Sequence, residues 1–339
     1  LASSFAPVAV PGDPSVLLLD ARRNELTRRD ARDGRLIWRQ PLGEPVDAAP
    51  LVLGERVYQS LPSGKLVAAS LSTGEVQATL DLAFPITQTP VGDESGRFLY
   101  LLGRKDCLFT ISRDPIACVD VQYLGHAEGS IPCPPARLGR FLIVAENDRI
   151  ADGRWRVLVL DDGGAKPRAV QTVDHPGWTW AAPPTSGSSI WAIGDRGGIQ
   201  VFSAGDYASP NPFRPIARLS PDAESSGPAF GYAPSEREIW IDAGRSGRFD
   251  LDDEGGKLEG KYRFADLGTA SAPIQVAAKR VVLSNRPPGD GVALRGVDPT
   301  TGKIEWQTVL GAPWPSPPIA SADGEALVAV DRAGRRLRI

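Results

Sequence analysis

Apolar and polar residues alternate in short runs along this chain, and turns that contain glycine separate the runs. In one well-defined unit the runs cover residues 49–53, 56–60, 65–69 and 75–82, with Gly54, Gly64 and Gly74 between them. A period of two residues is typical of strands, and glycine supplies the positive φ angle that tight hairpin turns need. No segment shows an apolar stripe with a period of 3.6 residues over several turns. The pattern therefore predicts an all-β chain.

This unit of four short strands recurs along the chain. A proline that follows small residues and precedes an apolar run returns every 40 to 49 residues, as Pro7, Pro50, Pro90, Pro134, Pro183, Pro228, Pro273 and Pro317. Four strands in each period of 40 to 50 residues are the sequence pattern of a β-propeller. We predict a single domain over residues 1–339, with blades that start near residues 6, 49, 89, 133, 182, 227, 272 and 316.

The two ends of the chain decide how the ring closes. The unit that starts near residue 316 has room for three strands, and residues 1–5 are long enough to supply a fourth. Closure by strands from both termini hides the sheet edges that an open ring would leave. We therefore predict an eight-bladed propeller of four-stranded antiparallel blades. A seven-bladed ring with a spare sheet is the alternative.

Composition adds two constraints. The net charge of −3 is too small to indicate a partner, and no apolar run of 18 residues that could span a membrane is present. The 339 residues include no methionine, not even at position 1, so we expect a fragment of a longer protein.

A specific motif stands at the turn between the third and fourth strands. The residues Asp30, Gly34 and Trp38 recur with the same spacing as Asp298, Gly302 and Trp306. The aspartate can accept hydrogen bonds from turn amides, the glycine can take a positive φ angle, and the tryptophan can lie between adjacent sheets. This motif resembles the tryptophan-docking repeat of the PQQ-like propellers, and we assign these six residues a structural docking role.

The resemblance implies one of two kinds of protein. Quinoprotein dehydrogenases bind pyrroloquinoline quinone (PQQ) and calcium over the channel, whereas other PQQ-like propellers are not enzymes and include the propeller subunit of the bacterial outer-membrane barrel-assembly machinery. The enzymes are longer and often carry two adjacent cysteines, but Cys107, Cys118 and Cys133 are far from adjacent. We predict a non-catalytic scaffolding domain without PQQ or calcium, which binds a protein partner in the periplasm or at the cell surface. A quinoprotein-type oxidoreductase is the alternative.

The sequence gives little support for other catalytic or metal-binding chemistry. The chain has no Gly-x-Ser-x-Gly elbow, no phosphate-binding glycine loop and no Cys-x-x-Cys pair, and two histidines cannot complete a zinc site. We therefore predict no catalytic residue and no metal site, and interpret the acidic run 250–256 as a solvated turn. The three cysteines form either one disulfide or none, so at least one thiol is unpaired.

The loops that join each fourth strand to the next first strand should surround one mouth of the channel. Both histidines and three of the eight tryptophans fall on these loops. Exposed aromatic side chains are typical of binding surfaces. The candidate residues for ligand or partner binding are Asp47, His126, Glu128, His175, Trp178, Trp180 and Trp314. The alternative is that these tryptophans fold inward and plug the channel.

Arginines gather in the first and last units, which become neighbours when the ring closes. The candidate basic surface comprises Arg22, Arg29, Arg32, Arg332, Arg335 and Arg336. Such a surface could steer an acidic partner, although an ordinary solvated outer face explains it as well. Aromatic residues are not interleaved with these arginines, so we expect no nucleic-acid binding. We expect a monomeric domain.

Overall fold

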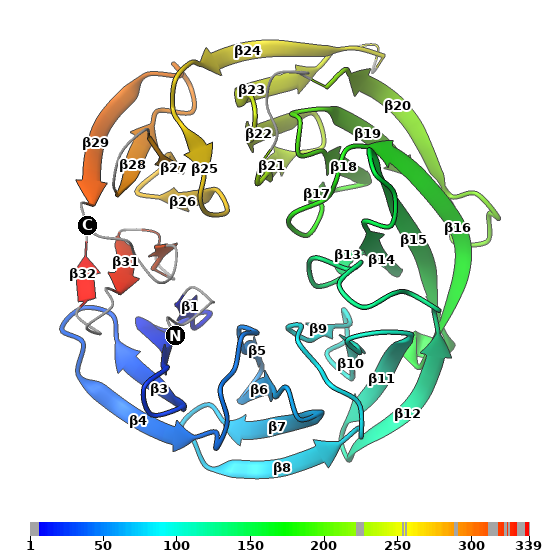
Figure 1. Cartoon of the computed structure of the whole chain (residues 1–339), viewed down its shortest axis with the longest axis vertical. Coiled ribbons are helices and arrows are strands. Elements are labelled where there is room, and N and C mark those ends of the chain that lie inside the picture. Colours follow the sequence, from blue (N-terminus) through cyan, green and yellow to red (C-terminus); the bar gives the residue numbers. More distant parts are fainter. Residues whose placement is uncertain are drawn as a thin grey trace.

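The fold is a closed ring of antiparallel sheets, each of which runs outward from the channel (Figure 1). The computed structural model describes residues 7–221, 227–252, 254, 256–287, 291–310, 318–321, 324, 326–330 and 336–338. Within these residues the regular elements are strands, apart from one 3-10 turn at Asp162–Gly164. The all-β prediction is therefore confirmed.

Each blade is a meander in which consecutive strands pair. The first three blades comprise β1 (Val8–Ala9), β2 (Ser15–Asp20), β3 (Glu25–Asp30) and β4 (Leu36–Pro41); β5 (Leu51–Leu53), β6 (Arg56–Ser60), β7 (Lys65–Ser70) and β8 (Val76–Asp81); and β9 (Val91–Gly92), β10 (Phe98–Leu102), β11 (Cys107–Arg113) and β12 (Ile116–Tyr123). The next three comprise β13 (Ala136–Leu138), β14 (Phe141–Glu146), β15 (Asp152–Asp161) and β16 (Lys166–Pro176); β17 (Thr185–Ser186), β18 (Ser189–Ile193), β19 (Ile199–Ala204) and β20 (Phe213–Leu219); and β21 (Phe230–Ser235), β22 (Glu238–Asp242), β23 (Ser246–Leu251) and β24 (Leu258–Phe264).

The seventh blade divides its innermost position between two strands. β25 (Thr269–Ala270) and β26 (Gln275–Ala277) both pair with β27 (Arg280–Arg286), which is followed by β28 (Val292–Val297) and β29 (Ile304–Leu310). A last sheet contains β30 (Ile319–Ala320), β31 (Leu327–Val330) and β32 (Arg336–Arg338).

The prediction of eight four-stranded blades is wrong. Seven blades have all four strand positions, and the last sheet has three strands in the part of the chain that the structure describes. This arrangement corresponds to the alternative, seven blades with an additional sheet. Residues 1–5, which were predicted to supply a further strand, lie outside the described residues.

The additional sheet lies between the seventh blade and the first (Figure 1). Val328 packs with Val16 and Leu18 of β2, and Leu327 packs with Leu294 of β28. Apolar contacts on both sides therefore hold the ring together where the two ends of the chain meet.

A bulge recurs at one place in each of the seven blades. The register between the third and fourth strands shifts after Arg28, Ala68, Thr110, Val157, Val201, Arg248 and Gly296. A bulge bends a strand and increases its twist. The repeated bulge therefore gives the outer strands a common curvature.

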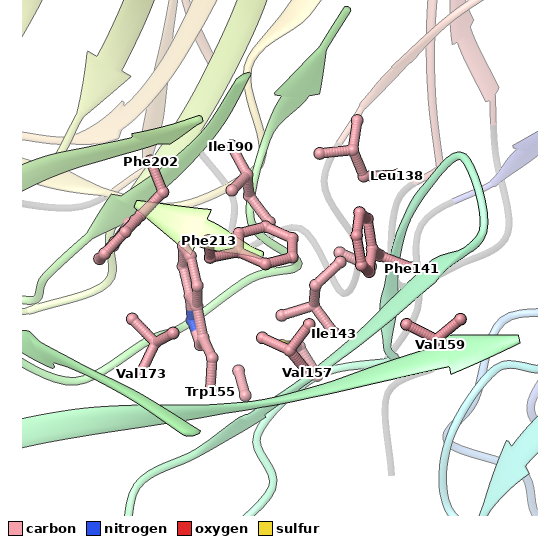
Figure 2. Close-up of a cluster of buried hydrophobic side chains, with 14 residues drawn as sticks. Leu138, Phe141, Ile143, Trp155, Val157, Val159, Val173, Ile190, Phe202 and Phe213 are labelled. Carbon is pink, nitrogen blue, oxygen red and sulfur yellow. The ribbon is translucent and has the colours of Figure 1, made fainter. Parts of the chain in front are cut away.

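The hydrophobic core is divided among the contacts between neighbouring blades. In the cluster shown in Figure 2, Trp155 and Ile143 from one blade pack against Phe202 and Phe213 from the next. Trp155 and Phe202 have ring centroids 5.4 Å apart. Such contacts fix the angle between blades, and hence the positions of the loops at the channel mouth.

Candidate functional site

The predicted docking turns are held by their aspartates. The Oδ1 atom of Asp30 accepts a hydrogen bond of 2.8 Å from the amide of Arg32, and Gly34 adopts a φ angle of +75°. The Oδ1 atom of Asp298 accepts 2.8 Å hydrogen bonds from the amides of Thr300 and Thr301. These amide donors favour the charged carboxylate, so they lower the pKa of Asp298.

Trp38 joins its blade to the docking turn of the next blade. Its Nε1 atom donates a hydrogen bond of 2.8 Å to the carbonyl of Leu71, and its indole ring is buried. The ring lies over Gly74, where an added Cβ would be 2.7 Å from Cδ2 and Cε3 of Trp38. Gly74 is therefore required for the close approach of the ring as well as for its φ angle of +76°.

Trp306 has a different environment. It packs over Gly296 of the neighbouring strand β28, where an added Cβ would be 2.1 Å from Nε1 of Trp306. Residues 331–335 are outside the described part of the chain.

Sequence reasoning missed three further docking residues. Tyr262 lies over Gly302, and its hydroxyl donates to the carbonyl of Thr300 in the next blade. The side chain of Gln171 exchanges two hydrogen bonds with the backbone of Phe213, at 2.8 and 2.9 Å. The hydroxyl of Tyr100 donates to the carbonyl of Gly164 at 2.8 Å. In each case a donor other than tryptophan reaches the main chain of the following blade, so the docking motif could not reveal it.

The two predicted rim histidines are buried. The Nε2 atom of His126 lies 3.2 Å from the carbonyl oxygen of Gly103, and that of His175 lies 3.2 Å from the hydroxyl of Thr179. Burial disfavours the charged imidazolium, so it lowers the pKa of His126 and lowers that of His175 to about 4. These neutral side chains hold the loops in place and do not face solvent.

Two of the three predicted rim tryptophans lie in the described part of the chain, and both are exposed. Trp178 and Trp180 retain 39% and 43% of their accessible surface. The amide of Trp178 donates to Oδ1 of Asp195 at 3.0 Å, and its Nε1 atom donates to the carbonyl of Arg149 at 2.6 Å. The loop is thus attached to the neighbouring loops of its own blade and of the preceding blade, while both indole rings remain accessible.

Asn147 gives this loop a further attachment. Its side-chain amide donates to the carbonyl of Thr179 at 2.8 Å and accepts from the amide of Thr179 at 3.0 Å. Because Thr179 lies between the two exposed tryptophans, this pair of bonds fixes the backbone that carries both.

Sequence reasoning also missed Ile150, which is 96% exposed. It follows Arg149, the residue whose carbonyl accepts the hydrogen bond from Trp178. The loop that carries Ile150 joins β14 to β15, and β15 and β16 are the longest strands of the structure, with 10 and 11 residues. The unusually long interval to the following proline was the available signal for these long strands. Ile150, Trp178 and Trp180 together form what we call the apolar rim.

Two other predicted rim residues, Glu128 and Asp47, are polar and are not part of the apolar rim. Glu128 forms an ion pair of 2.5 Å with Arg104, and Asp47 is an exposed residue on the loop that enters the second blade. Trp314 lies outside the described residues.

Part of the predicted basic surface can be placed. Arg22 and Arg32 are exposed, and Nη1 of Arg29 donates to the carbonyl of Gly34 at 3.1 Å. Arg332 and Arg335 lie outside the described residues, and the side chain of Arg336 on β32 is likewise not described.

Two of the predicted rim residues, His126 and Glu128, bear on the alternative that PQQ and calcium bind at the channel mouth. The His126 side chain is buried, and Oε1 of Glu128 is paired with Arg104. In the part of the chain that the structure describes, no group of three or more His, Cys, Asp or Glu side chains could hold a metal ion. In the acidic run, Asp250 and Leu251 end strand β23, and Oδ1 of Asp252 then accepts from the amides of Gly256 and Lys257, at 2.8 and 3.1 Å.

All three cysteines are free thiols. Cys118 is exposed and Cys107 is half-buried, whereas Cys133 is fully buried and its burial raises the pKa of the thiol to about 12. Among the described residues, no helix is long and apolar enough to cross a membrane.

Comparison with known proteins supports the resemblance inferred from the docking motif. The sequence profile of the family described as outer membrane protein assembly factor BamB matches residues 3–81. The resemblance to the PQQ-like propellers is confirmed. A curated relative, outer membrane protein assembly factor BamB of Aliivibrio fischeri, is 33% identical over 86 residues. The matched region spans 22% of this chain and 22% of that relative.

Solved structures agree with the fold. BamB from Moraxella catarrhalis has a TM-score of 0.60 at 13% identity, over 83% of this chain and 80% of that chain. The computationally designed Ika8 protein has a TM-score of 0.70 at 11% identity, over 99% and 96% of the two chains. Hydrazine synthase from Kuenenia stuttgartiensis has a TM-score of 0.59 at 11% identity, over 100% and 96%. At these identities the likeness concerns the fold alone.

Proposed function

We propose that this domain is a non-catalytic scaffold that binds a protein partner through the apolar rim. From the likeness to the BamB relatives, we propose that it lies in the periplasm or at the cell surface of a bacterium, in a protein that takes part in outer-membrane protein assembly. The match to those relatives supports the class of function, and the rim supplies the contact surface.

The observation that carries this proposal is the combination of exposure and rigidity at Trp178 and Trp180. Their backbone is attached to Asn147 and Asp195, yet both indole rings are accessible. A tryptophan held in place in the free protein loses little conformational entropy on binding, and tryptophan is enriched among the residues that dominate interface energy. Ile150 extends the same apolar surface.

Photo-crosslinking in the bacterium tests the proposal. A photo-reactive phenylalanine analogue replaces Trp180, and in a matched strain it replaces Leu36 on β4, which is 42% exposed. We expect defined cross-linked proteins at position 180 that are absent at position 36, and we expect Ile150→Asp to reduce them by at least about tenfold. Identical products at the two positions, or no effect of Ile150→Asp, would contradict the proposal.

We further propose that the domain functions without PQQ or calcium. The support is the position of His126, whose side chain is buried, and of Glu128, which forms an ion pair with Arg104. Native mass spectrometry before and after addition of PQQ with calcium tests this point. We expect no stoichiometric mass shift, and a shift accompanied by dye-linked alcohol oxidation would favour the quinoprotein alternative.

The exposed arginines of the basic surface that the structure describes support a second, smaller role, in which they increase the rate at which the partner associates. Arg22 and Arg32 are exposed on the first blade. Contacts of this kind act mainly on the association rate and weaken as salt is added. Substitution of both arginines by glutamine should lower the association rate with the cross-linked partner at low salt. An unchanged rate would mean that these arginines belong to an ordinary solvated face.

A further inference from the structure

The outer strand β12 exposes a row of large apolar side chains on the side of the propeller. Val119 is 48% exposed, Val121 is 52% exposed and Tyr123 is 75% exposed. β12 pairs only with β11, so it is an edge strand whose outer backbone groups have no partner strand. An apolar edge strand is a template for pairing with another chain.

Among the fourth strands that the structure describes, β12 exposes the largest number of large apolar side chains. Strands β4, β16, β20 and β24 each contain at least one arginine, and β20 also contains Pro215. Strand β29 contains one charged residue, Glu305, and exposes Ile304 and Val309, whereas β8 ends at Asp81 and exposes Val76. Charged residues and proline on edges are the usual means of preventing unwanted pairing. The single charged residue of β12 is Asp120.

Two side chains of β12 point to the same side. Val121 and Tyr123 lie opposite Phe109 and Cys107 of β11, and directly opposite residues share a face of the sheet. Phe109 and Cys107 pack against the preceding blade, so Val121 and Tyr123 face that side as well. Val119 is the extra residue of the bulge between Cys118 and Asp120 and marks the end of the regular segment.

We propose that a second copy of this chain pairs with β12 antiparallel across a two-fold axis at Val121. In this register Val121 lies opposite its own counterpart, Val119 lies opposite Tyr123, and Asp120 lies opposite the uncharged Gln122. No like charges meet, and the exposed side chains of Val121 and Tyr123 become covered. The two four-stranded blades join into one continuous sheet. The dimer would replace the monomer expected from the sequence, and it leaves the apolar rim of each copy free.

Sedimentation equilibrium on the purified chain tests the pairing. We expect a reversible dimer at concentrations between about 1 µM and 1 mM, because one edge pair buries less surface than a standard interface. Val121→Lys places two lysines opposite each other and should weaken the dimer at least about 100-fold. Val309→Lys on β29 is the matched control, since Val309 is 53% exposed on another outer strand, and it should leave the dimer unchanged.

Disulfide formation tests the register. In a chain with Cys107→Ser and Cys118→Ser, the substitution Val121→Cys should give a covalent dimer under mild oxidation, and Val309→Cys should not. A monomer throughout the concentration range refutes the proposal. A dimer that Val121→Lys does not weaken, in a variant with an unchanged circular dichroism spectrum, also refutes it because another surface then forms the contact.

Discussion

The substitution Gly74→Ala, which adds a single methyl group, tests how much the close contact between Trp38 and Gly74 matters for stability. Gly74→Ala introduces a Cβ atom 2.7 Å from two atoms of the Trp38 ring, well inside ordinary van der Waals contact. The ring cannot move freely, because its Nε1 atom is bonded to the carbonyl of Leu71 at 2.8 Å. Overpacking of this kind destabilises a protein by about 1–3 kcal/mol. Alanine at a positive φ angle costs a further ~1–2 kcal/mol.

Gly43→Ala separates the two effects. Gly43 has a φ angle of +81°, close to the +76° of Gly74, and nothing lies within 4 Å of its added Cβ. Urea denaturation of both variants should therefore show that Gly74→Ala lowers the free energy of unfolding by about 1–3 kcal/mol more than Gly43→Ala. In a Trp38→Ala background this excess should disappear, since the ring that the methyl group meets has been removed.

Equal losses for the two glycine variants would refute this reasoning. They would mean that the tryptophan adjusts without cost, and that the docking turn needs glycine for its backbone angle alone. An excess that persists in the Trp38→Ala background would locate the strain elsewhere in the turn.

Three other properties follow from burial. Asp242 is fully buried, and burial raises its pKa to about 6 from 3.8, although Ser246 and Asn285 donate to its carboxylate. The stabilising effect of the Asp242 proton is complete below pH 3.8 and is lost as the pH rises through 6. Between these limits the free energy of unfolding, measured relative to that of Asp242→Asn, should fall by about 3 kcal/mol. A difference between the two proteins in urea denaturation that does not depend on pH would contradict this. Native protein should react with maleimide at the exposed Cys118, whereas the buried Cys133, whose thiol pKa is about 12, should react only in denaturant; labelling of Cys133 in the native state would show that its blade opens. The ring carbon resonances of His175 should show no titration between pH 5.5 and 8 because its pKa is about 4, and a midpoint near 6.5 would mean that the imidazole is accessible.

The repeat and the strands could be predicted from the sequence because they depend on local chemistry. Period-two alternation and the glycines at the bends act over a few residues, and strands β5 to β8 fall on the runs read from the sequence. The number of four-stranded blades could not be obtained in this way. It depends on how the last sheet is completed, which local alternation does not specify.

The candidate site was predictable in part. The exposure of Trp178 and Trp180 agrees with their expected place on the loops, but the burial of His126 and His175 depends on contacts with Gly103 and Thr179 that no spacing reveals. Ile150 was missed because its exposure depends on the length of β15 and β16. The docking roles of Tyr262 and Gln171 were missed because neither is the residue that the motif requires.

The docking contacts have a consequence for how such chains diverge. In the contacts made by Trp38, Tyr100 and Tyr262, the acceptor in the next blade is a main-chain carbonyl, which mutation does not remove. Any side chain that reaches this carbonyl with an N–H or O–H group can make the same hydrogen bond. The bond between blades can therefore be kept while the residue type that donates it changes. Each blade can then lose the recognisable signature separately while the ring persists.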